Sequence, residues 1–305
     1  APIQMECAAP NLVIEGEIPS ELEGSLYRIG PNPQFAPRGQ YHWFAGDGMI
    51  HNFKLESGRV SYENRWVRTT NWKLENEAGE SLFSPLNPMQ NDPSVANVRT
   101  DGIANTNIVW HGGKLLALVE SHAPFEIDPE SLNSIGPWTF QDKLSGPMTA
   151  HPKIDPESGE MLFFAYNADP ENRVSSRMAF HKADKHGNLV QSEFFDAPYS
   201  AMVHDFIVTK EHVIFPIMPL TSSMERAMGG GSLYAWDPTK NSYIGIMPRD
   251  GCSSDLRWFE GDPAYVFHPM NAYNDGDKII CDVCEYPEAP LFPHADGSKT
   301  DPTKS

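Results

Sequence analysis

Short apolar runs separated by turn-forming residues recur along the whole chain. Residues 107–110 and 115–119 flank His111-Gly-Gly-Lys114, a spacing typical of a β-hairpin. Two further pairs of runs, within 206–217 and 232–246, flank turns that contain charged residues, Pro or Asn, and we expect a hairpin at each. No window sustains an amphipathic helix beyond a few turns. The pattern therefore predicts a nearly all-β protein.

Several all-β architectures fit this pattern. The chain has 305 residues with 27 prolines and 23 glycines, and its recurring hairpins suit a β-propeller, a β-helix or a pair of sandwiches. No crisp repeat signature marks each blade, so the pattern favours the propeller without excluding the other two. Residues 285–305 are polar and proline-rich, which predicts a surface loop that is cut in its middle.

Composition narrows the class of protein. The chain is 40% hydrophobic and 11% aromatic, which is enough to bury a large core. Its net charge of −18 and pI of about 4.9 argue against a nucleic-acid partner. No apolar run approaches the roughly 18 residues of a membrane-spanning helix, and the first twenty residues do not resemble a signal peptide. We therefore expect a cytoplasmic protein, although Ala1 could follow a removed leader.

The cysteines do not indicate a disulfide framework, because four in a chain of this length are too few. Cys281 and Cys284 have the spacing of a redox or zinc pair. However, they lie in a predicted strand at 278–285, where a separation of three residues places the thiols on opposite faces. With no second such pair, we expect a structural role.

The eleven histidines fall into two kinds of setting. Some lie at expected hairpin tips, where we expect them to be solvated: His111, His186 and His212. Others lie beside an apolar strand segment: His151, His204 and His268. A single histidine of this second kind is more often a hydrogen-bonded core or rim residue than a ligand. Neutral imidazole nevertheless suits Fe, Zn, Cu and Ni, and widely separated ligands are what an axial site in a propeller requires.

A metal-bound imidazole usually donates its second N–H to a carboxylate or a carbonyl. Glu120 follows the apolar run 115–119 and is a candidate for this role; the alternative is an exposed glutamate at a strand end. No nucleophile elbow, phosphate loop or dinucleotide fingerprint occurs. Gly229-Gly-Gly-Ser232 has no following Lys and is more simply a flexible loop.

At a series of short motifs the sequence resembles the carotenoid cleavage oxygenase family, which includes bacterial enzymes that cleave lignostilbene and isoeugenol. The motifs are Leu-Tyr-Arg-Ile-Gly-Pro-Asn-Pro at 26–33, His-Trp-Phe-Ala-Gly-Asp-Gly-Met-Ile-His at 42–51, Ala-Asn-Thr-Asn at 104–107, Ala-Leu-Val-Glu at 117–120, Ala-His-Pro-Lys-Ile-Asp at 150–155, Met-Val-His-Asp-Phe at 202–206, and Arg-Trp-Phe-Glu at 257–260 with Phe267 and His268 after it. Their number and order make the resemblance specific.

The resemblance implies a seven-bladed β-propeller with iron(II) on its axis, held by four histidines beneath a loop cap that forms an apolar tunnel. His151, His204 and His268 match the first three ligands, and Glu120 matches the first glutamate that orients them. It also implies a reaction: O₂ is added across a conjugated double bond, two carbonyl compounds result, and no organic cofactor is needed.

In the family the fourth histidine and the later glutamates lie beyond Ser305. The resemblance therefore implies that residues 1–305 are a single propeller domain lacking its C-terminal blades, with the rest carried by a second chain or absent. His294, in the polar tail, is a poor substitute for the fourth ligand. An apolar substrate could also bring the protein to a membrane surface.

The resemblance also bears on the substrate. Members that cleave hydroxystilbenes and isoeugenol hold the phenol with a Tyr and with a Lys immediately before the glutamate; here the Lys position is Val119 and the Tyr region reads Phe-Ser-Pro-Leu-Asn-Pro at 83–88. We therefore favour a carotenoid or apocarotenoid, with a stilbene or phenylpropanoid as the alternative. Phe44 is expected near the tunnel, unless it is an ordinary core aromatic.

Two readings from other classes stay open. A zinc hydrolase also fits three histidines with an open fourth position, although no general base is evident beside them. A non-catalytic propeller scaffold would hold no stoichiometric metal. Bound iron and O₂ consumption would distinguish the oxygenase from both.

Overall fold

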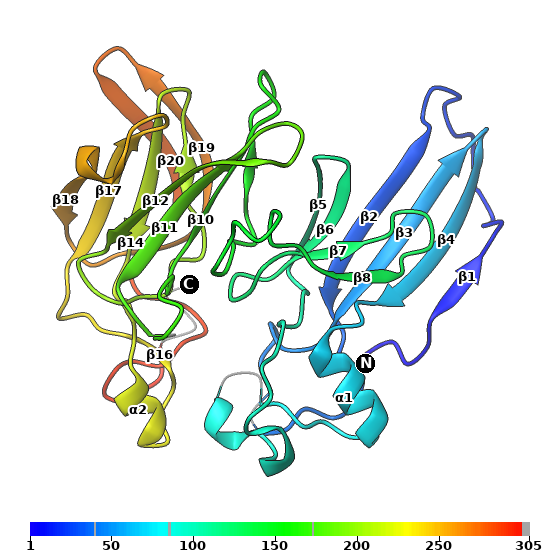
Figure 1. Ribbon diagram of the computed structural model, residues 1–305, viewed down its shortest axis with the longest axis horizontal. Helices are drawn as coiled ribbons and strands as arrows, with labels where there is room; N and C mark the ends of the chain where they lie inside the picture. The colour runs from blue at the N-terminus through cyan, green and yellow to red at the C-terminus, as the bar shows by residue number, and fades with distance from the viewer. Residues whose placement is uncertain (40, 85–86, 173, 301–305) are drawn as a thin grey trace. The chain divides into compact units, whose positions relative to one another are not determined.

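The computed structural model describes residues 1–39, 41–84, 87–172 and 174–300. It comprises two compact units, Ala1–Gln141 and Asp142–Ser305, and each is described here by itself. Figure 1 shows that both consist mainly of antiparallel strands with few helical turns.

The first unit contains two four-stranded antiparallel sheets. One has the order β1-β4-β3-β2 and the other β5-β6-β7-β8. In the chain order, α1 (Thr70–Ala78) comes between the two sheets; it begins where the Thr69 hydroxyl accepts a hydrogen bond from the Trp72 amide and ends at Gly79 with φ of 73°. The remaining elements are β1 (Cys7–Ala9), β2 (Gly24–Pro31), β3 (Gly48–Glu56), β4 (Arg59–Trp66), η1 (Pro88–Gln90), η2 (Pro93–Val95), β5 (Asn107–His111), β6 (Lys114–Leu118), β7 (Phe125–Ile127) and β8 (Ser134–Pro137).

The second unit contains two more four-stranded sheets, β12-β11-β10-β9 and β13-β14-β17-β18, with two-stranded sheets β15-β16 and β19-β20. The elements are β9 (Lys153–Ile154), β10 (Met161–Ala165), β11 (Arg177–Ala183), β12 (Leu189–Asp196), β13 (Ile207–Val208), β14 (His212–Ile217), β15 (Leu220–Ser222), α2 (Met224–Met228), β16 (Tyr234–Trp236), β17 (Ser242–Pro248), η3 (Ser253–Asp255), β18 (Arg257–Gly261), β19 (Tyr265–Asp275) and β20 (Lys278–Tyr286). Sheets of successive antiparallel strands are the units from which propellers are built.

An aromatic core joins the sheets of the second unit. Phe215 on β14 is fully buried, and its ring lies 4.9 Å from that of Phe195 and 6.2 Å from that of Phe164. Phe206, just before β13, stacks on Phe215 at 6.3 Å. Aromatic pairs at such distances contribute beyond their buried area, so this cluster stabilises the two sheets whose edge strands β9 and β13 follow the segments at 149–153 and 202–206.

The structure confirms two of the three predicted hairpins, β5-β6 and β13-β14. The prediction of a hairpin at 232–246 is wrong, because β16 pairs with β15 whereas β17 pairs with β14. Trp236 is 2% exposed, and its amide donates to the Pro293 carbonyl at 2.8 Å. Because this indole is buried, the run that contains Trp236 belongs to another sheet. A local turn pattern does not reveal such a partner.

The tail is also more ordered than its composition predicts. Ala289 and Phe292 are buried in the core of the second unit, so the prediction of a surface loop is wrong for this part of 285–300. His111 is another exception, since it is 6% exposed instead of solvated at a hairpin tip. Cys281 and Cys284 lie on a strand, as predicted, and all four cysteines are free.

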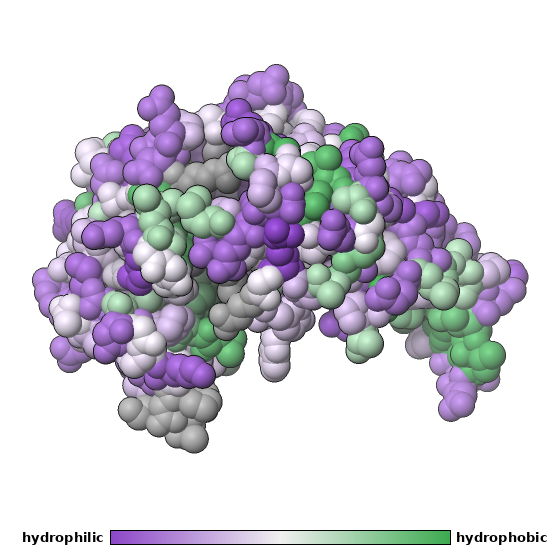
Figure 2. Space-filling model, turned by 90° about the horizontal axis from the view of Figure 1, so that it is seen from below, coloured by the Kyte–Doolittle hydropathy of each residue, from purple (hydrophilic) through white to green (hydrophobic). Residues whose placement is uncertain are grey.

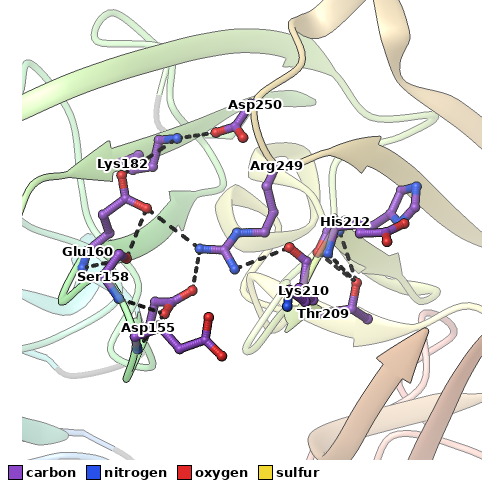
Figure 3. Close-up of polar contacts among 11 residues, drawn as sticks. Asp155, Ser158, Glu160, Lys182, Thr209, Lys210, His212, Arg249 and Asp250 are labelled. Atoms are coloured by element: carbon purple, nitrogen blue, oxygen red, sulfur yellow. Dashed lines mark hydrogen bonds and ion pairs between the residues drawn. The ribbon is translucent and has the colours of Figure 1, made fainter.

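Figure 3 shows an ion-pair network on the second unit. The Arg249 guanidinium lies 2.7 Å from the Asp155 carboxylate and donates to the Lys210 carbonyl at 3.4 Å. Nearby, Lys182 pairs with Asp250 and lies 3.9 Å from Glu160. The network joins the turn after β9 to the β13-β14 turn, on segments that continue from two of the predicted ligands.

On the face drawn in Figure 2, hydrophilic residues cover most of the surface and hydrophobic residues form several separate groups. Among the described residues, no helix combines the length and the apolar character needed to cross a bilayer. Neither the surface nor the helices indicate a function.

His181 on β11 gives the fold a testable dependence on acid. It is 3% exposed, its Nδ1 lies 2.9 Å from the Ser192 hydroxyl, and burial lowers its pKa to about 4. In the unfolded chain this imidazole takes up a proton near pH 6.5, whereas the folded protein resists protonation down to about pH 4. As pH falls through this window, we expect the free energy of unfolding to drop by about 3 kcal/mol on account of His181.

Denaturant unfolding at a series of pH values measures this effect. His181→Gln should flatten the curve between pH 6.5 and 4, whereas His186→Gln, at an exposed turn, should leave it unchanged. Equal slopes in wild type and His181→Gln would show that His181 does not couple folding to protons.

Candidate metal centre

Three histidines converge in the second unit: His151, His204 and His268. One nitrogen of each lies within 4.8 Å of the corresponding nitrogen of the others. The ring centroids are 4.6, 4.8 and 4.8 Å apart, and the Nε2 atoms of His151 and His204 are separated by 3.1 Å. The structure thus brings together residues that lie far apart in the sequence: His151 and His268 are separated by 117 positions.

A different local structure positions each of the three histidines. The amide of His151 donates to the Thr149 hydroxyl at 3.0 Å, and the Thr149 amide donates to the Phe164 carbonyl on β10 at 2.8 Å. His204 lies in a segment of buried neighbours just before β13. His268 lies within β19 where the register with β20 shifts on both sides of Pro269. A bulge of this kind re-aims a side chain, and proline cannot donate to the ladder.

A buried carboxylate lies beside the trio. Asp205 is 5% exposed, and its Oδ2 lies 3.3 Å from Nδ1 of His268. Its Oδ1 accepts hydrogen bonds from the Lys153 ammonium at 2.8 Å and from the Phe206 amide at 2.8 Å. Both carboxylate oxygens therefore have partners, which burial of a charged group requires.

The protonation states of His151 and Asp205 favour the binding of a cation. Burial, and after it the charge of His204, lower the pKa of His151 to about 4 against a smaller opposing effect of Asp205. Burial alone would raise the pKa of Asp205, but the hydrogen bond from His268 and the charge of Lys153 outweigh it and leave that pKa below its usual value. At neutral pH, His151 therefore presents a lone pair and Asp205 a negative charge.

This donor set fits a divalent transition metal. Neutral imidazoles are good ligands for Fe, Zn, Cu and Ni, and three converging nitrogens leave coordination positions open. An oxygen-seeking cation such as Ca²⁺ or Mg²⁺ would instead require carboxylates and carbonyls. Asp205 cannot readily serve as a ligand because both of its oxygens are occupied.

The other predicted site residues belong to the first unit. Glu120 is half-buried in the turn that follows β6. Phe44 is 44% exposed, so it is not the core aromatic of the alternative prediction, and its carbonyl accepts a hydrogen bond from Asn105 at 2.9 Å. Their roles beside the metal stay predictions. Of the region expected to supply a tyrosine, Pro85 and Leu86 lie outside the described residues.

Sequence reasoning missed the roles of Asp205 and Lys153. Both lie in the motifs that carry His151 and His204. A signal was nevertheless present, because an aspartate between Met202-Val-His and Phe206-Ile-Val sits in an apolar run and must find a partner if it is buried. The identity of that partner, two residues after another histidine, becomes evident only in three dimensions.

The antiparallel sheets and the histidine trio are those expected of a β-propeller with a metal site, and the comparison with known families supports this class. A family model described as RPE65, retinal pigment epithelial membrane protein, matches residues 1–305, so the chain belongs to the RPE65 or carotenoid oxygenase family. The isoeugenol monooxygenase of Pseudomonas putida is 40% identical over 308 residues, which cover all of this chain and 64% of that protein.

Solved structures extend the comparison. The lignostilbene dioxygenase of Pseudomonas brassicacearum matches with a TM-score of 0.93 and 35% identity, over 99% of this chain and 63% of that one. Cobalt-substituted apocarotenoid oxygenase of Synechocystis matches with a TM-score of 0.83 and 30% identity, over 98% and 65%. These matches confirm the predicted all-β propeller class, while seven blades stay a prediction. The chain spans slightly less than two thirds of these relatives.

The metal centre predicts a simple result for the purified protein. We expect one transition-metal ion per chain, removable by a chelator, and His204→Ala should weaken its binding by more than about 100-fold, which exceeds the typical effect of an outer partner. Elemental analysis and a Co(II) titration measure this. His186→Ala, at an exposed turn, is the matched control and should bind normally. Unchanged binding in His204→Ala would place the metal elsewhere.

Proposed function

We propose that this protein is an iron(II)-dependent oxygenase that cleaves a conjugated carbon–carbon double bond of an apolar substrate with O₂. In the balanced reaction one alkene and one O₂ give two carbonyl compounds. The observation that carries the proposal is the convergence of His151, His204 and His268 in a chain of the carotenoid oxygenase family. Relatives of this chain are named isoeugenol monooxygenase, lignostilbene dioxygenase and apocarotenoid oxygenase.

Among the metals that imidazole nitrogens bind, we favour iron because the proposed reaction uses O₂. Neutral imidazoles leave the full dipositive charge on the metal, and bound iron(II) would supply the activation of O₂. The chain's own residues prepare the site: the low pKa of His151 removes competition from protons at neutral pH, and Asp205 faces Nδ1 of His268. Asp205 thus contacts a ligand histidine, and it is not free to remove a proton from the substrate.

The hydrogen bonds of Asp205 weigh against a zinc hydrolase. Such an enzyme needs a general base that is free to accept a proton from metal-bound water. Asp205, the carboxylate that contacts the trio, is already paired with Lys153 and the Phe206 amide. A scaffold without catalysis does not account for three imidazoles held within 4.8 Å of one another.

For the substrate we favour a polyene without an activating phenol, such as a carotenoid or an apocarotenoid. The support is Val119, which stands where phenol-binding members carry a lysine and is 8% exposed. A valine cannot make a charge-assisted hydrogen bond to a phenolate. A phenylpropanoid or stilbene is the second candidate, and the 40% identity to an isoeugenol monooxygenase favours it.

The proposal is tested with iron-loaded protein and a panel of apocarotenals, hydroxystilbenes and isoeugenol. We expect one O₂ consumed per alkene, two carbonyl products by mass spectrometry, and loss of both in His268→Ala. An electrode trace and product masses provide the measurement. Full occupancy by iron with no O₂ uptake on any conjugated alkene would contradict the proposal, and hydrolysis supported by zinc would favour the alternative.

Substitution of Val119 separates the two substrate classes. In Val119→Lys we expect kcat/KM for 4-hydroxystilbene to rise by roughly 10-fold or more, since a hydrogen bond to a charged group contributes about 1.5–3 kcal/mol. Val119→Met adds length without charge and should give no such rise. A methoxystilbene, in which the phenol is blocked, should not respond to either change. If wild type already prefers hydroxystilbene over every polyene, the favoured substrate class is wrong.

A further inference from the structure

We propose that Asp47, in the first unit, carries a proton up to neutral pH and that its ionisation weakens the attachment of α1 to the segment that begins β3. The contact involves a second buried carboxylate, Glu75, which lies on α1 itself. It is separate from the histidine trio and does not depend on the proposed function. It gives a local response to pH to the unit that carries Phe44 and Glu120.

Asp47 is a buried acid without a cationic partner. It is 5% exposed and lies directly before β3. Its Oδ2 accepts a hydrogen bond from Nε2 of Gln34 at 3.3 Å, and the same nitrogen donates to the Trp72 carbonyl of α1 at 3.2 Å. Within the part of the chain that the structure describes, no Lys, Arg or His forms an ion pair with Asp47. An ionised carboxylate is costly to bury in such a setting.

Glu75 adds a second carboxylate that interacts with Asp47. It is 8% exposed, and its Oε1 accepts hydrogen bonds from the Ser81 hydroxyl at 3.2 Å and from the amides of Leu82 and Phe83 at 2.8 and 3.0 Å. Three donors stabilise the charged form of Glu75. Burial, and after it the charge of Glu75, raise the pKa of Asp47 to about 7 against smaller effects of hydrogen bonds. The proton of the pair therefore resides on Asp47.

The buried face of α1 favours a neutral acid over a second anion. Asn71 and Glu75 are the two buried residues of this helix, and they lie one turn apart on the same face. Gln34 holds Asp47 beside the carbonyl of Trp72, the residue after Asn71. The Oδ1 atom of Asn71 has no hydrogen-bond donor among the described residues. A protonated carboxyl has an O–H to donate to such an acceptor, whereas a carboxylate can only accept, so α1 favours the protonated form of Asp47.

The backbone around Asp47 is too closely packed to move the side chain into water. Gly46 has φ of 134°, and a Cβ there would lie 2.7 Å from Cδ of Pro33. A Cβ on Gly48 would overlap the carbonyl oxygen of Ala104. By contrast, α1 has only nine residues, which is too short for a helix to be stable by itself. Ionisation of Asp47 is therefore relieved by displacement of α1, and with it of the segment at 81–83.

The other charged groups around α1 do not compensate Asp47, because each has a different partner, is neutral or faces solvent. His42, on the same segment as Asp47, is neutral at neutral pH because burial lowers its pKa. Lys73, Glu77 and Glu80 are exposed. The remaining groups are paired: Arg68 with Glu6 at 2.8 Å, Arg38 with Asp92 at 3.2 Å, and Asp101 with the Thr70 amide at 2.7 Å.

The dependence on pH follows from the difference between the folded and unfolded states. In the unfolded chain Asp47 ionises near pH 3.8, whereas in the folded protein it keeps its proton to about pH 7. The folded state binds more protons between these values, so the stabilisation is greatest in weak acid. It is lost progressively as the pH rises through this window and changes no further above it. His181, in the second unit, acts in the opposite direction, so the measurement must be local.

Hydrogen exchange of the full chain, followed by mass spectrometry of the peptide at 70–83 and corrected for intrinsic exchange rates, measures the local stability. We expect the protection factors of the α1 amides in wild type to fall by about tenfold per pH unit between about pH 5 and 7 and to stay level above that. Asp47→Asn should remove this slope and raise protection at about pH 7.5 by at least about 10-fold. Glu80→Gln, which removes an exposed carboxylate beside α1, is the matched control and should follow wild type.

Infrared spectra of the wild-type protein test the proton directly, without a variant that could fail to fold. We expect a protonated-carboxyl band at about pH 6 that disappears at about pH 8.5 and is missing from Asp47→Asn. No such band in wild type at about pH 6, or level protection between about pH 5 and 7, would overturn the proposal. A wild-type slope retained in Asp47→Asn would overturn it too, because the proton would then belong to another group. None of these outcomes bears on the metal centre.

Discussion

The buried charge of Asp205 is the constraint on which the candidate site depends. A carboxylate that is 5% exposed must have partners for both oxygens, and here they come from Lys153, the Phe206 amide and His268. Satisfying that single group brings two other segments against the start of β13. The aromatic core beneath supports the same place, since Phe206 stacks on Phe215. Electrostatics and packing thus favour one arrangement of the three histidines.

Much of the candidate site could be predicted from sequence because its residues have unusual local settings. His151, His204 and His268 lie beside apolar segments, and their agreement with family motifs identified them as a set. The hairpins at β5-β6 and β13-β14 follow from apolar runs with a turn between them, and turn chemistry is local.

What could not be predicted depends on partners distant in sequence. The apolar run before Asp237 resembles half of a hairpin, yet β16 pairs with β15 because Trp236 is buried in the core. The position of His111 at a tip does not reveal that it is buried. Asp205 was visible as a charge in an apolar run, but its partners were not, since hydrogen-bond partners are fixed by tertiary geometry and not by spacing.

The contact of the tail with Trp236 has a consequence for the dynamics of the second unit. The Trp236 amide donates to the Pro293 carbonyl, and the Ala295 amide donates to the Trp236 carbonyl, so residues 293–295 pair with the edge of β16 through an isolated parallel bridge. Ala289 and Phe292 are buried in the same core cluster as Trp236, so we expect this segment to open together with that core. Its amide hydrogens should therefore exchange with solvent at the slow rate of a core element, although its composition is that of a linker.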